Sequence, residues 1–540
     1  MRQLGPISPS AADFAVRAQS TNVIPVTVTV MADTLTPVGL YQLLARDRPG
    51  TFLMESAAPG GVWSRYSFVG VNSRATLTTD PLGDDPQAAY WQGEVPAGVP
   101  TDGTIADVLK QTLAVLATED QERADLPTLL AGLVGYIGWD MIQFWEQLPA
   151  RPDNDLQLPL AAMNLVTDLA IFDNTNATVT LVANAINFNG LQTGVQDAYA
   201  DALARLEKML TTLQQPAGAH LGVTTGTRAD EDPAARIAQR LASEIRADWD
   251  AEEYGTFVTE SKATIEAGEI TQIVLSRRFE TELDASALDV YRMLRFFNPS
   301  PYMFLYNFQT PKGQDFQLVG SSPEALVTVQ HGQAISHPIA GTRRRGATEA
   351  EDQQLEEELL ADDKERSEHI MLVDLAKEDL AKVCDPATIQ VPRYMFVERF
   401  SHVMHLISHV TGTIRQDLSA YDVLAATFPA GTLSGAPKPR AIELIEQWEP
   451  YARGPYGGVV GYFDFAGNMD MAIVIRSAIL KDGKAYVQTG AGIVAQSVPA
   501  AEADETTNKA AAPLRGVLLA KDLQDVDAGY LNELNQLKDS

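Results

Sequence analysis

Cysteine is almost missing from this chain of 540 residues, since Cys384 is the only one. A single thiol excludes a disulfide within the chain and a metal site built from several thiolates, so we expect a reducing compartment or indifference to redox state. Any bound metal ion would need oxygen or nitrogen ligands.

Long apolar runs and a secretion signal are also missing. The most apolar uncharged stretch, residues 126–139, contains three glycines and is shorter than the roughly 20 residues of a membrane-spanning helix. The first 19 residues have no continuous apolar segment followed by a cleavage pattern. We therefore expect no membrane segment, a cytoplasmic location and a flexible N-terminal tail over residues 1–22.

Positive charge is scarce, because 41 Lys and Arg residues face 71 Asp and Glu residues and the formal net charge is −30. Such a field repels nucleic acid phosphates and anionic membrane surfaces, so we expect neither as a partner. Apolar residues are plentiful at 45%, while 38 glycines and 30 prolines are an ordinary share for a globular protein. The length allows three or four domains of about 150 residues, or fewer larger ones.

Residues 23–233 are expected to form a sheet-centred N-terminal domain. Alternating apolar and polar residues predict its strands, two of which meet at a hairpin turn over residues 173–176. Residues 214–233 lose this periodicity and are rich in Gly, Thr and charge, which predicts a domain boundary. The expected strands are 23–30, 164–172 and 177–185, and the expected helices are 103–119 and 195–213.

Residues 234–524 are expected to form a second domain, followed by a tail over residues 525–540. Strand-like and helix-like patterns alternate here, so the predicted fold class is α+β rather than all-helical. The expected strands include 272–279 and 470–480, and the expected helices include 362–380 and 499–512.

Two of these helices each carry glutamates three residues apart, Glu365 with Glu368 and Glu502 with Glu505. Residues i and i+3 lie on one helix face, so two such faces that meet would bring four carboxylates together. Like charges that close need a cation, and carboxylate oxygens suit Mg²⁺. An isolated pair of this kind is more often a solvated helix face, so the pattern alone indicates a metal only weakly.

Histidines are concentrated in the second half, where six of the seven lie between positions 331 and 409. His369 follows Glu368 directly, and His402, His405 and His409 are close together in sequence. With a usual pKa of about 6.5, a histidine beside a cleft can exchange protons near neutral pH. A hydrogen-bonded structural histidine is the alternative.

Glycine-rich turns follow several predicted strands, at residues 428–440, 454–463 and 488–497. Residues 490–495 match a dinucleotide fingerprint, but no second strand follows to carry a ribose-binding acid, and the chain has no phosphate-binding P-loop motif. Glycine also lets backbone N–H groups approach a carboxylate, for which Arg476, Tyr456 and Lys509 are candidate partners. Tight turns and close sheet packing are the alternative.

Taken together, six motifs resemble the chorismate-utilising enzymes, and within them the large subunits of anthranilate synthases. They occur in the family's order and cover most of residues 250–520. The motifs are PIAGTRRRG (338–346), KERSEHIMLVDLA (364–376), SHVMHL (401–406), AGTLSGAPK (430–438), GPYGG (454–458) and EADETTNKA (502–510). The resemblance implies packed antiparallel β-sheets in an orthogonal sandwich, helices outside, and a Mg²⁺-bound chorismate between the sheets.

The resemblance also implies roles for individual residues. Glu368 and Glu505 would bind Mg²⁺ directly, and Glu365 and Glu502 would act through water or supporting contacts. Arg476 and Tyr456 would hold one substrate carboxylate, and the amides around Gly490, Ala491 and Gly492 would hold the other. The rest of the pocket would be formed by Gly341, Thr342, Thr432 and Lys509.

Two positions distinguish the sibling reactions. Isochorismate and salicylate synthases carry a water-activating lysine where this chain has Gln272, so ammonia is the expected nucleophile. Aminodeoxychorismate synthases often carry a lysine where this chain has Ala340. The implied reaction converts chorismate and ammonia to anthranilate and pyruvate, the first committed step of tryptophan biosynthesis. The alternatives are an aminodeoxychorismate or aminodeoxyisochorismate synthase, and a regulatory subunit that binds tryptophan or chorismate with little turnover.

In the implied mechanism, Glu324 is the acid for the departing C4 hydroxyl group, ammonia adds at C2, and His405 transfers the protons that expel pyruvate. A glutamate needs a raised pKa for that role. Cys384 lies inside the synthase region, where packing is its expected role. A separate glutamine amidotransferase subunit, in a hetero-oligomer, is therefore expected to supply the ammonia.

A feedback site is expected in the first half, because FLMES (52–56), RYSFVG (65–70) and NPSPYMF (298–304) resemble the family's tryptophan pocket. The candidates are Glu55, Ser56, Arg65, Pro301, Tyr302 and Met303. A strand end and a core turn are the alternative interpretation. The chain departs from the family pattern at DLAKED (374–379), usually DLARND, and at His409, where many relatives carry Arg.

Overall fold

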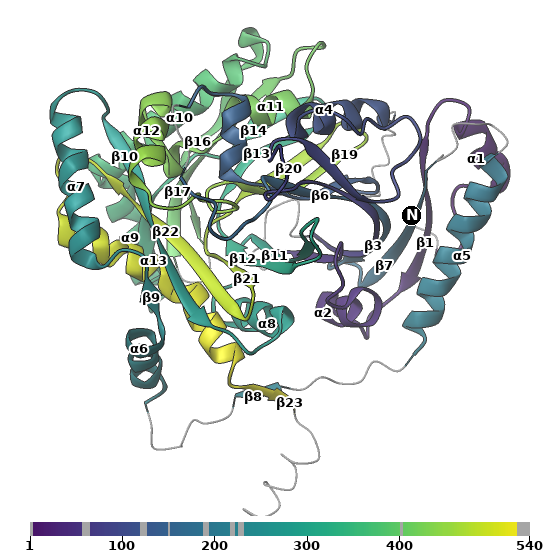
Figure 1. The fold of residues 1–540 in the computed structure, drawn as a ribbon, viewed down its shortest axis with the longest axis horizontal. Helices are drawn as coiled ribbons and strands as arrows, with labels where there is room; N and C mark the ends of the chain where they lie inside the picture. The colour runs from purple at the N-terminus through teal and green to yellow at the C-terminus, as the bar shows by residue number, and fades with distance from the viewer. Residues whose placement is uncertain are drawn as a thin grey trace, which may run out of the picture.

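The computed structural model describes residues 4–56, 65–118, 127–148, 152–186, 194–215, 222–224, 232–399 and 403–525. Within these residues, 21 strands join in one hydrogen-bonded sheet system with antiparallel ladders. Helices α1 (Ala11–Arg17) and α5 (Val195–Leu213) lie along one side, and α7 (Ala251–Glu266) and α13 (Pro499–Ala520) along the other (Figure 1). The α+β prediction is confirmed. No described helix is both long and apolar enough to span a bilayer.

The N-terminal strands lie where the sequence predicted them, although β6 and β7 are buried on both faces. Strand β1 (Val23–Met31) pairs with β7 (Thr178–Ile186), which pairs in turn with β6 (Ala161–Asp173). The β6–β7 hairpin turns at the predicted place because the Asp173 carboxylate accepts the backbone N–H groups of Thr175 and Asn176, at 3.0 and 3.2 Å. Helix α5 has the predicted bounds, and the helix predicted over 103–119 is the shorter α4 (Ile105–Val115).

The described N-terminal residues 4–22 are not the loose tail that the sequence predicted. Phe14 of α1 is 3% exposed and lies against Tyr199 of α5, with ring centroids 4.8 Å apart. Ser8 forms a β-bridge with Thr27 of β1. The prediction was wrong because a seven-residue helix has little periodicity of its own, and its anchoring contact is made by a residue far away in sequence.

Strands from the two halves of the chain pair with each other. Strand β2 (Phe52–Glu55) pairs with β11 (Tyr302–Gln309), and β5 (Gly132–Ile137) pairs with β19 (Val459–Asp464). The sheet system therefore runs across the boundary predicted at residues 214–233. Short strand β23 (Leu523–Asp525) pairs with β8 (Gly222–Thr224), while residues 526–540 of the predicted C-terminal tail lie outside the described part.

The strand predicted over residues 470–480 is two strands, β20 (Met469–Ile473) and β21 (Ser477–Lys481). Between them Arg476 adopts a φ of 53°, in the left-handed region that L-residues rarely occupy. A continuous apolar run, residues 471–475, leads into the break and apolar residues resume at 478, so the sequence pattern could not reveal it. Backbone strain of this kind concentrates at functional sites, where the surrounding structure holds it in place.

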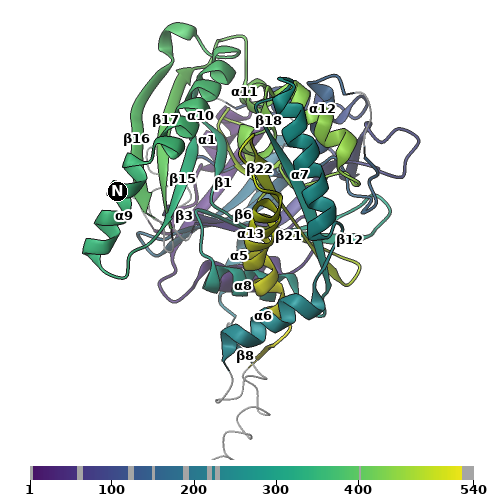
Figure 2. The same ribbon diagram turned by 90° about the vertical axis from the view of Figure 1, so that its left-hand side faces the viewer.

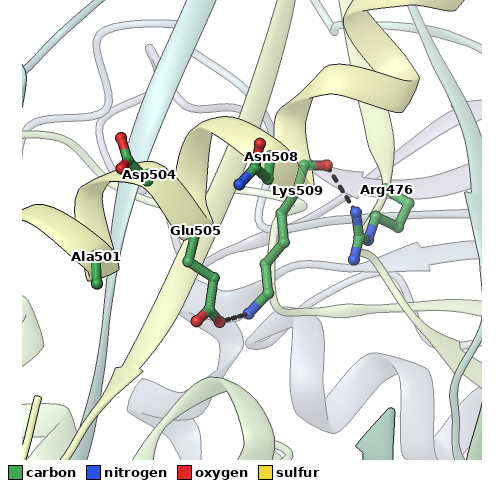
Figure 3. A pocket seen from close by; sticks show the side chains of 6 residues that line it. All are labelled: Arg476, Ala501, Asp504, Glu505, Asn508 and Lys509. Carbon is green, nitrogen blue, oxygen red and sulfur yellow. Dashed lines mark hydrogen bonds and ion pairs between the residues drawn. The ribbon is translucent and has the colours of Figure 1, made fainter. Parts of the chain in front are cut away.

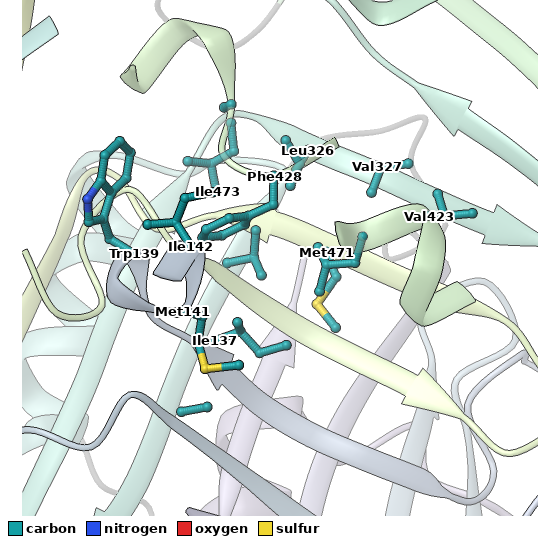
Figure 4. Packing of buried hydrophobic residues seen from close by; sticks show 14 of the residues in the cluster. Ile137, Trp139, Met141, Ile142, Leu326, Val327, Val423, Phe428, Met471 and Ile473 are labelled. Carbon is teal, nitrogen blue, oxygen red and sulfur yellow. The ribbon is translucent and has the colours of Figure 1, made fainter. Parts of the chain in front are cut away.

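A group of strands and one helix form a further part of the fold in the second half of the chain. Strands β15 (Ile339–Arg344), β16 (Gln390–Arg399) and β17 (Val403–Thr413) form a sheet region covered by α10 (Asp363–Ala381), visible at the upper left of Figure 2. A buried apolar cluster fills the interior, with contributions from both halves such as Trp139, Phe428 and Ile473 (Figure 4). The predicted helices 362–380 and 499–512 correspond to α10 and α13. His402 lies outside the described residues.

Candidate active site

An open cleft of about 450 Å³ lies along the N-terminal half of α13, beside the strained Arg476 (Figure 3). Lys509 Nζ forms an ion pair with Glu505 Oε1 at 2.7 Å and donates to the carbonyl oxygen of Gly490 at 3.0 Å. Arg476 Nη1 donates to the backbone oxygen of Lys509 at 2.9 Å. The cleft is lined by Arg476, Ala501, Asp504, Glu505, Asn508 and Lys509.

The glycines of β22 (Lys484–Ile493) leave room for two candidate site residues. A Cβ on Gly490 would come within 3.0 Å of the Tyr456 hydroxyl, and a Cβ on Gly492 within 3.1 Å of the Gln272 amide nitrogen. Burial raises the pKa of Tyr456 well above its usual range, so its hydroxyl stays protonated and can donate to an anion. The sequence left two explanations for these glycines, anion approach and close packing, and these contacts support close packing.

Glu324 is partly buried beside Thr432. The Thr432 hydroxyl donates to Glu324 Oε1 at 3.0 Å. Burial raises the pKa of Glu324 to about 7, against the opposing effects of the Thr432 hydrogen bond and the positive charge of Lys509. A carboxyl group with that pKa is still protonated in part at neutral pH and can give its proton to a leaving group.

His405 lies on β17 with its Nδ1 atom 3.0 Å from the Gly341 carbonyl oxygen and 3.1 Å from the Thr342 hydroxyl. The ladder between β15 and β17 shifts register at Gly341, whose φ is 65°. The carbonyl accepts the Nδ1 proton, so Nε2 is the basic nitrogen of the neutral ring. Burial, and to a smaller extent Arg476, lowers the pKa of His405, which keeps it neutral at physiological pH.

The four glutamates of α10 and α13 interact electrostatically across the site. Burial first, and then the charges of Glu365 and Glu505, raise the pKa of Glu368. Burial and Glu505 raise that of Glu502. In the described part of the chain, however, no three acidic, His or Cys side chains are already arranged around one metal position. Lys509 is ion-paired with Glu505 itself, where the sequence analysis expected it only in the substrate pocket.

The donor set nevertheless fits Mg²⁺. All four side chains offer hard carboxylate oxygens, and their mutual repulsion would be relieved by a divalent cation. Glu368 and Glu505 are the pair that approaches from opposite helices, so they are the residues suited to hold such an ion.

The proposed tryptophan residues are only partly brought together. Met303 faces Glu55 in the β2–β11 ladder, and the Glu55 carboxylate accepts hydrogen bonds from Tyr291, at 2.5 Å, and from Arg295. The Tyr302 hydroxyl donates to Asp470 at 3.2 Å. Ser56 and Pro301 directly flank β2 and β11. Arg65 forms an ion pair with Asp173 at 3.0 Å, at the β6–β7 hairpin.

The structure shows which residues contact the two segments that depart from the family pattern. In the DLAKED segment, Asp379 accepts ion pairs from Lys438 at 2.7 Å and Lys382 at 2.9 Å. The His409 ring packs against the His337 ring with centroids 4.9 Å apart. Cys384 is fully buried, as expected for a packing role.

Sequence reasoning missed a buried ion pair next to the GPYGG turn. Glu449 and Arg453 are nearly inaccessible to solvent, and Arg453 lies over the ring of Trp139. Their spacing of four residues was a signal that could have been read. Their burial was not visible in the sequence, because it results from contacts with β10 (Gln272–Glu282) and with the N-terminal half.

Comparisons with known proteins agree with this geometry. The sequence model of the chorismate binding enzyme family matches residues 66–515. Anthranilate synthase component 1 of Arthrobacter globiformis is 53% identical over 527 residues, covering 97% of this chain and 96% of that protein. The same-named protein of Mycobacterium tuberculosis (strain ATCC 25618 / H37Rv) is 49% identical over 516 residues, covering 95% and 96%.

Solved structures give the same result. Anthranilate synthase component I from Streptococcus pneumoniae TIGR4 matches with a TM-score of 0.68 at 31% identity, covering 89% of this chain and 98% of that one. The menaquinone-specific isochorismate synthase from Escherichia coli, at 19% identity and a TM-score of 0.64, shares the fold. The chain therefore belongs to the chorismate binding enzyme family. Within that family it groups with the anthranilate synthase component 1 proteins, so the resemblance drawn from the six motifs is confirmed.

Proposed function

We propose that the chain converts chorismate and ammonia to anthranilate and pyruvate, the first step of tryptophan biosynthesis. The observation that carries this proposal is the 53% identity with an anthranilate synthase component 1 over 97% of this chain. In support, the pKa of Glu324 is raised to about 7 and the pKa of His405 is lowered. One acid and one base with separated pKa values are what an amination followed by an elimination requires.

Of the groups proposed to bind substrate, Arg476 and Lys509 line the cleft. Arg476 and the protonated Tyr456 hydroxyl hold one carboxylate of chorismate, while Gly490, Ala491 and Gly492 offer backbone amides to the other. Gly341, Thr342, Thr432 and Lys509 complete the pocket. Glu368 and Glu505 would hold Mg²⁺, with Glu365 and Glu502 in support, and the ion would supply positive charge for the substrate carboxylate.

The chemistry then uses two proton transfers. Glu324 gives its proton to the C4 hydroxyl group, which leaves as water while ammonia adds at C2. His405 next removes the proton from C2, and the bond between the ring and the enolpyruvyl oxygen breaks to give anthranilate and enolpyruvate. Enolpyruvate then takes up a proton at its methylene carbon, from His405 or water, and becomes pyruvate. Gln272 has no basic amine with which to activate water, which favours ammonia as the nucleophile.

A second subunit supplies the ammonia. The relatives bear the name component 1, which implies a component 2. Burial raises the pKa of the Cys384 thiol, so this chain's one cysteine is unsuited to act as a glutaminase nucleophile. The expected assembly is a hetero-oligomer with a glutamine amidotransferase, located in the cytoplasm.

Purified chain incubated with chorismate, Mg²⁺ and ammonium tests the proposal, with anthranilate followed by fluorescence and products identified by mass spectrometry. Anthranilate and pyruvate, abolished by EDTA, are expected. An amino product that keeps the enolpyruvyl group would identify an aminodeoxychorismate or aminodeoxyisochorismate synthase instead. The absence of any turnover would favour the regulatory subunit.

A further inference from the structure

We propose that the buried Glu449–Arg453 pair is a positioning clamp that joins the three backbone segments carrying Gln272, Thr432 and Tyr456. This inference rests on the proposed chorismate site. Neither residue is placed to touch substrate; the clamp acts by fixing the groups that do.

Arg453 reaches two of these segments through its guanidinium group and the third through its own backbone. Its Nη1 donates to the Leu433 carbonyl oxygen at 2.8 Å, and its Nη2 donates to the Val274 carbonyl oxygen at 2.8 Å. Leu433 follows Thr432, which holds the acid Glu324, and Val274 lies two residues after Gln272. The third segment is the arginine's own, because its carbonyl oxygen accepts the backbone N–H of Tyr456 at 3.1 Å.

Glu449 fixes the direction of that guanidinium group. It accepts from Arg453 Nε at 2.8 Å and from Nη2 at 2.6 Å, and its Oε1 also accepts the backbone N–H of Ser276 at 2.8 Å. The two side chains are 1% and 2% exposed. Ser276 faces Gly490 in the β10–β22 ladder, so the carboxylate also ties the clamp to the strand that packs against the Tyr456 hydroxyl.

Residues of the N-terminal half also contact the clamp. The guanidinium carbon of Arg453 lies 4.2 Å from the Trp139 ring centroid, and Trp139 Nε1 donates to Glu446 at 2.7 Å. The backbone of Gly454 bonds in both directions, donating to the Asp140 carboxylate at 2.9 Å and accepting from the Trp139 N–H at 2.7 Å. The turn that presents Tyr456 is thus held on both sides.

Stability alone is a weak reason to bury such a pair. Replacing a buried ion pair with apolar groups of similar volume is often neutral or stabilising, because desolvation of the charges offsets their attraction. The planar guanidinium group of arginine bonds two carbonyl groups and a carboxylate at once, and so fixes their relative positions. The ammonium group of lysine cannot make this set of contacts. The function that matches this geometry is alignment of the substrate-binding residues.

The test compares Arg453→Lys with Arg205→Lys in the purified chain. Arg205 is a matched control, since it pairs with buried Asp168 and bridges the carbonyl oxygens of Thr167 and Asn184 at 3.2 and 2.9 Å, within the N-terminal sheet. Circular dichroism and the melting temperature report folding for each variant. Steady-state kinetics with saturating ammonium report KM for chorismate and kcat.

For folded Arg453→Lys we expect KM for chorismate to rise at least tenfold, whereas Arg205→Lys lowers the melting temperature but leaves KM within twofold of wild type. A structural role would reduce the active fraction, and thus kcat, without moving KM. An unchanged KM in folded Arg453→Lys, or an equal rise in Arg205→Lys, overturns the clamp. If Arg453→Lys does not fold, Glu449→Gln decides by the same KM criterion. Wild-type chain that makes no anthranilate would refute the proposed function instead, which separates the two failures.

Discussion

The Thr432 hydroxyl lies 3.0 Å from Oε1 of Glu324 and donates to it. This single hydrogen bond opposes the effect of burial, which by itself would raise the pKa of the carboxyl group further. The pair therefore sets the pH range in which Glu324 can act as an acid. Because the protonated form is the one that donates, the fraction of competent enzyme falls as the pH rises through about 7.

The Thr432→Val variant should move that alkaline limb to higher pH, since it removes a contact that favours the carboxylate. At pH 6 its kcat should fall by no more than about tenfold, as expected for the loss of one hydrogen bond of about 1 kcal/mol. The pH profile is measured at a constant concentration of unprotonated ammonia. Glu324→Gln is the control, and it should lower kcat by about 10²–10⁴-fold at every pH. An identical limb in Thr432→Val and wild type would disprove the coupling.

His405→Ala should spare the addition of ammonia and impair the loss of pyruvate. We expect anthranilate formation to fall by about 10²-fold or more, because a positioned base is removed. Mass spectrometry should then detect an aminated compound that retains the enolpyruvyl group. The matched control is His331→Ala, at an exposed position in the turn between β13 (Ala325–Gln330) and β14 (Gln333–Ser336). Unchanged anthranilate turnover in His405→Ala would refute the assignment.

Glu368→Gln should weaken the use of Mg²⁺. The variant removes one of the two carboxylates that approach from opposite helices, so the Mg²⁺ concentration for half-maximal activity should rise by about 10–100-fold or more. Equilibrium dialysis of Mg²⁺ against the chain gives an independent readout. Glu378→Gln, on an exposed face of the same helix, should behave as wild type. Equal Mg²⁺ requirements for Glu368→Gln and wild type would remove Glu368 from the site.

Tryptophan binding should depend on Ser56, which follows β2 directly. Calorimetry on the wild type and on Ser56→Ala should show a loss of affinity of about fivefold or more, the value of a hydrogen bond of about 1 kcal/mol. Turnover of chorismate without tryptophan serves as the control and should be unaffected. Equal affinity in both proteins would exclude Ser56 from a feedback pocket.

The parts of the fold that the sequence predicted are those with local causes. Strand β1 and the turn at Asp173 are determined by residues next to one another in the sequence, and helix α5 has an apolar stripe of its own. The packing of Phe14 on Tyr199 and the break at Arg476 depend on distant contacts, which periodicity does not record.

The site shows the same division. The family resemblance predicted roles for Glu324, His405 and the paired glutamates, and His405 and the glutamates lie within short recognisable motifs. The Glu449–Arg453 pair was not predicted because its contacts are made with the carbonyl groups of Val274 and Leu433, which are not next to it in the sequence. The near-neutral pKa of Glu324 likewise comes from burial, a property of the assembled molecule.

The pairing of β2 with β11 and of β5 with β19 limits how this chain can be modified. Deleting the first half would leave β11 and β19 each with an open edge. Such edges invite pairing with other chains and aggregation. The two halves are therefore expected to fold only together, and a change to the proposed tryptophan site is better made by point substitution than by truncation.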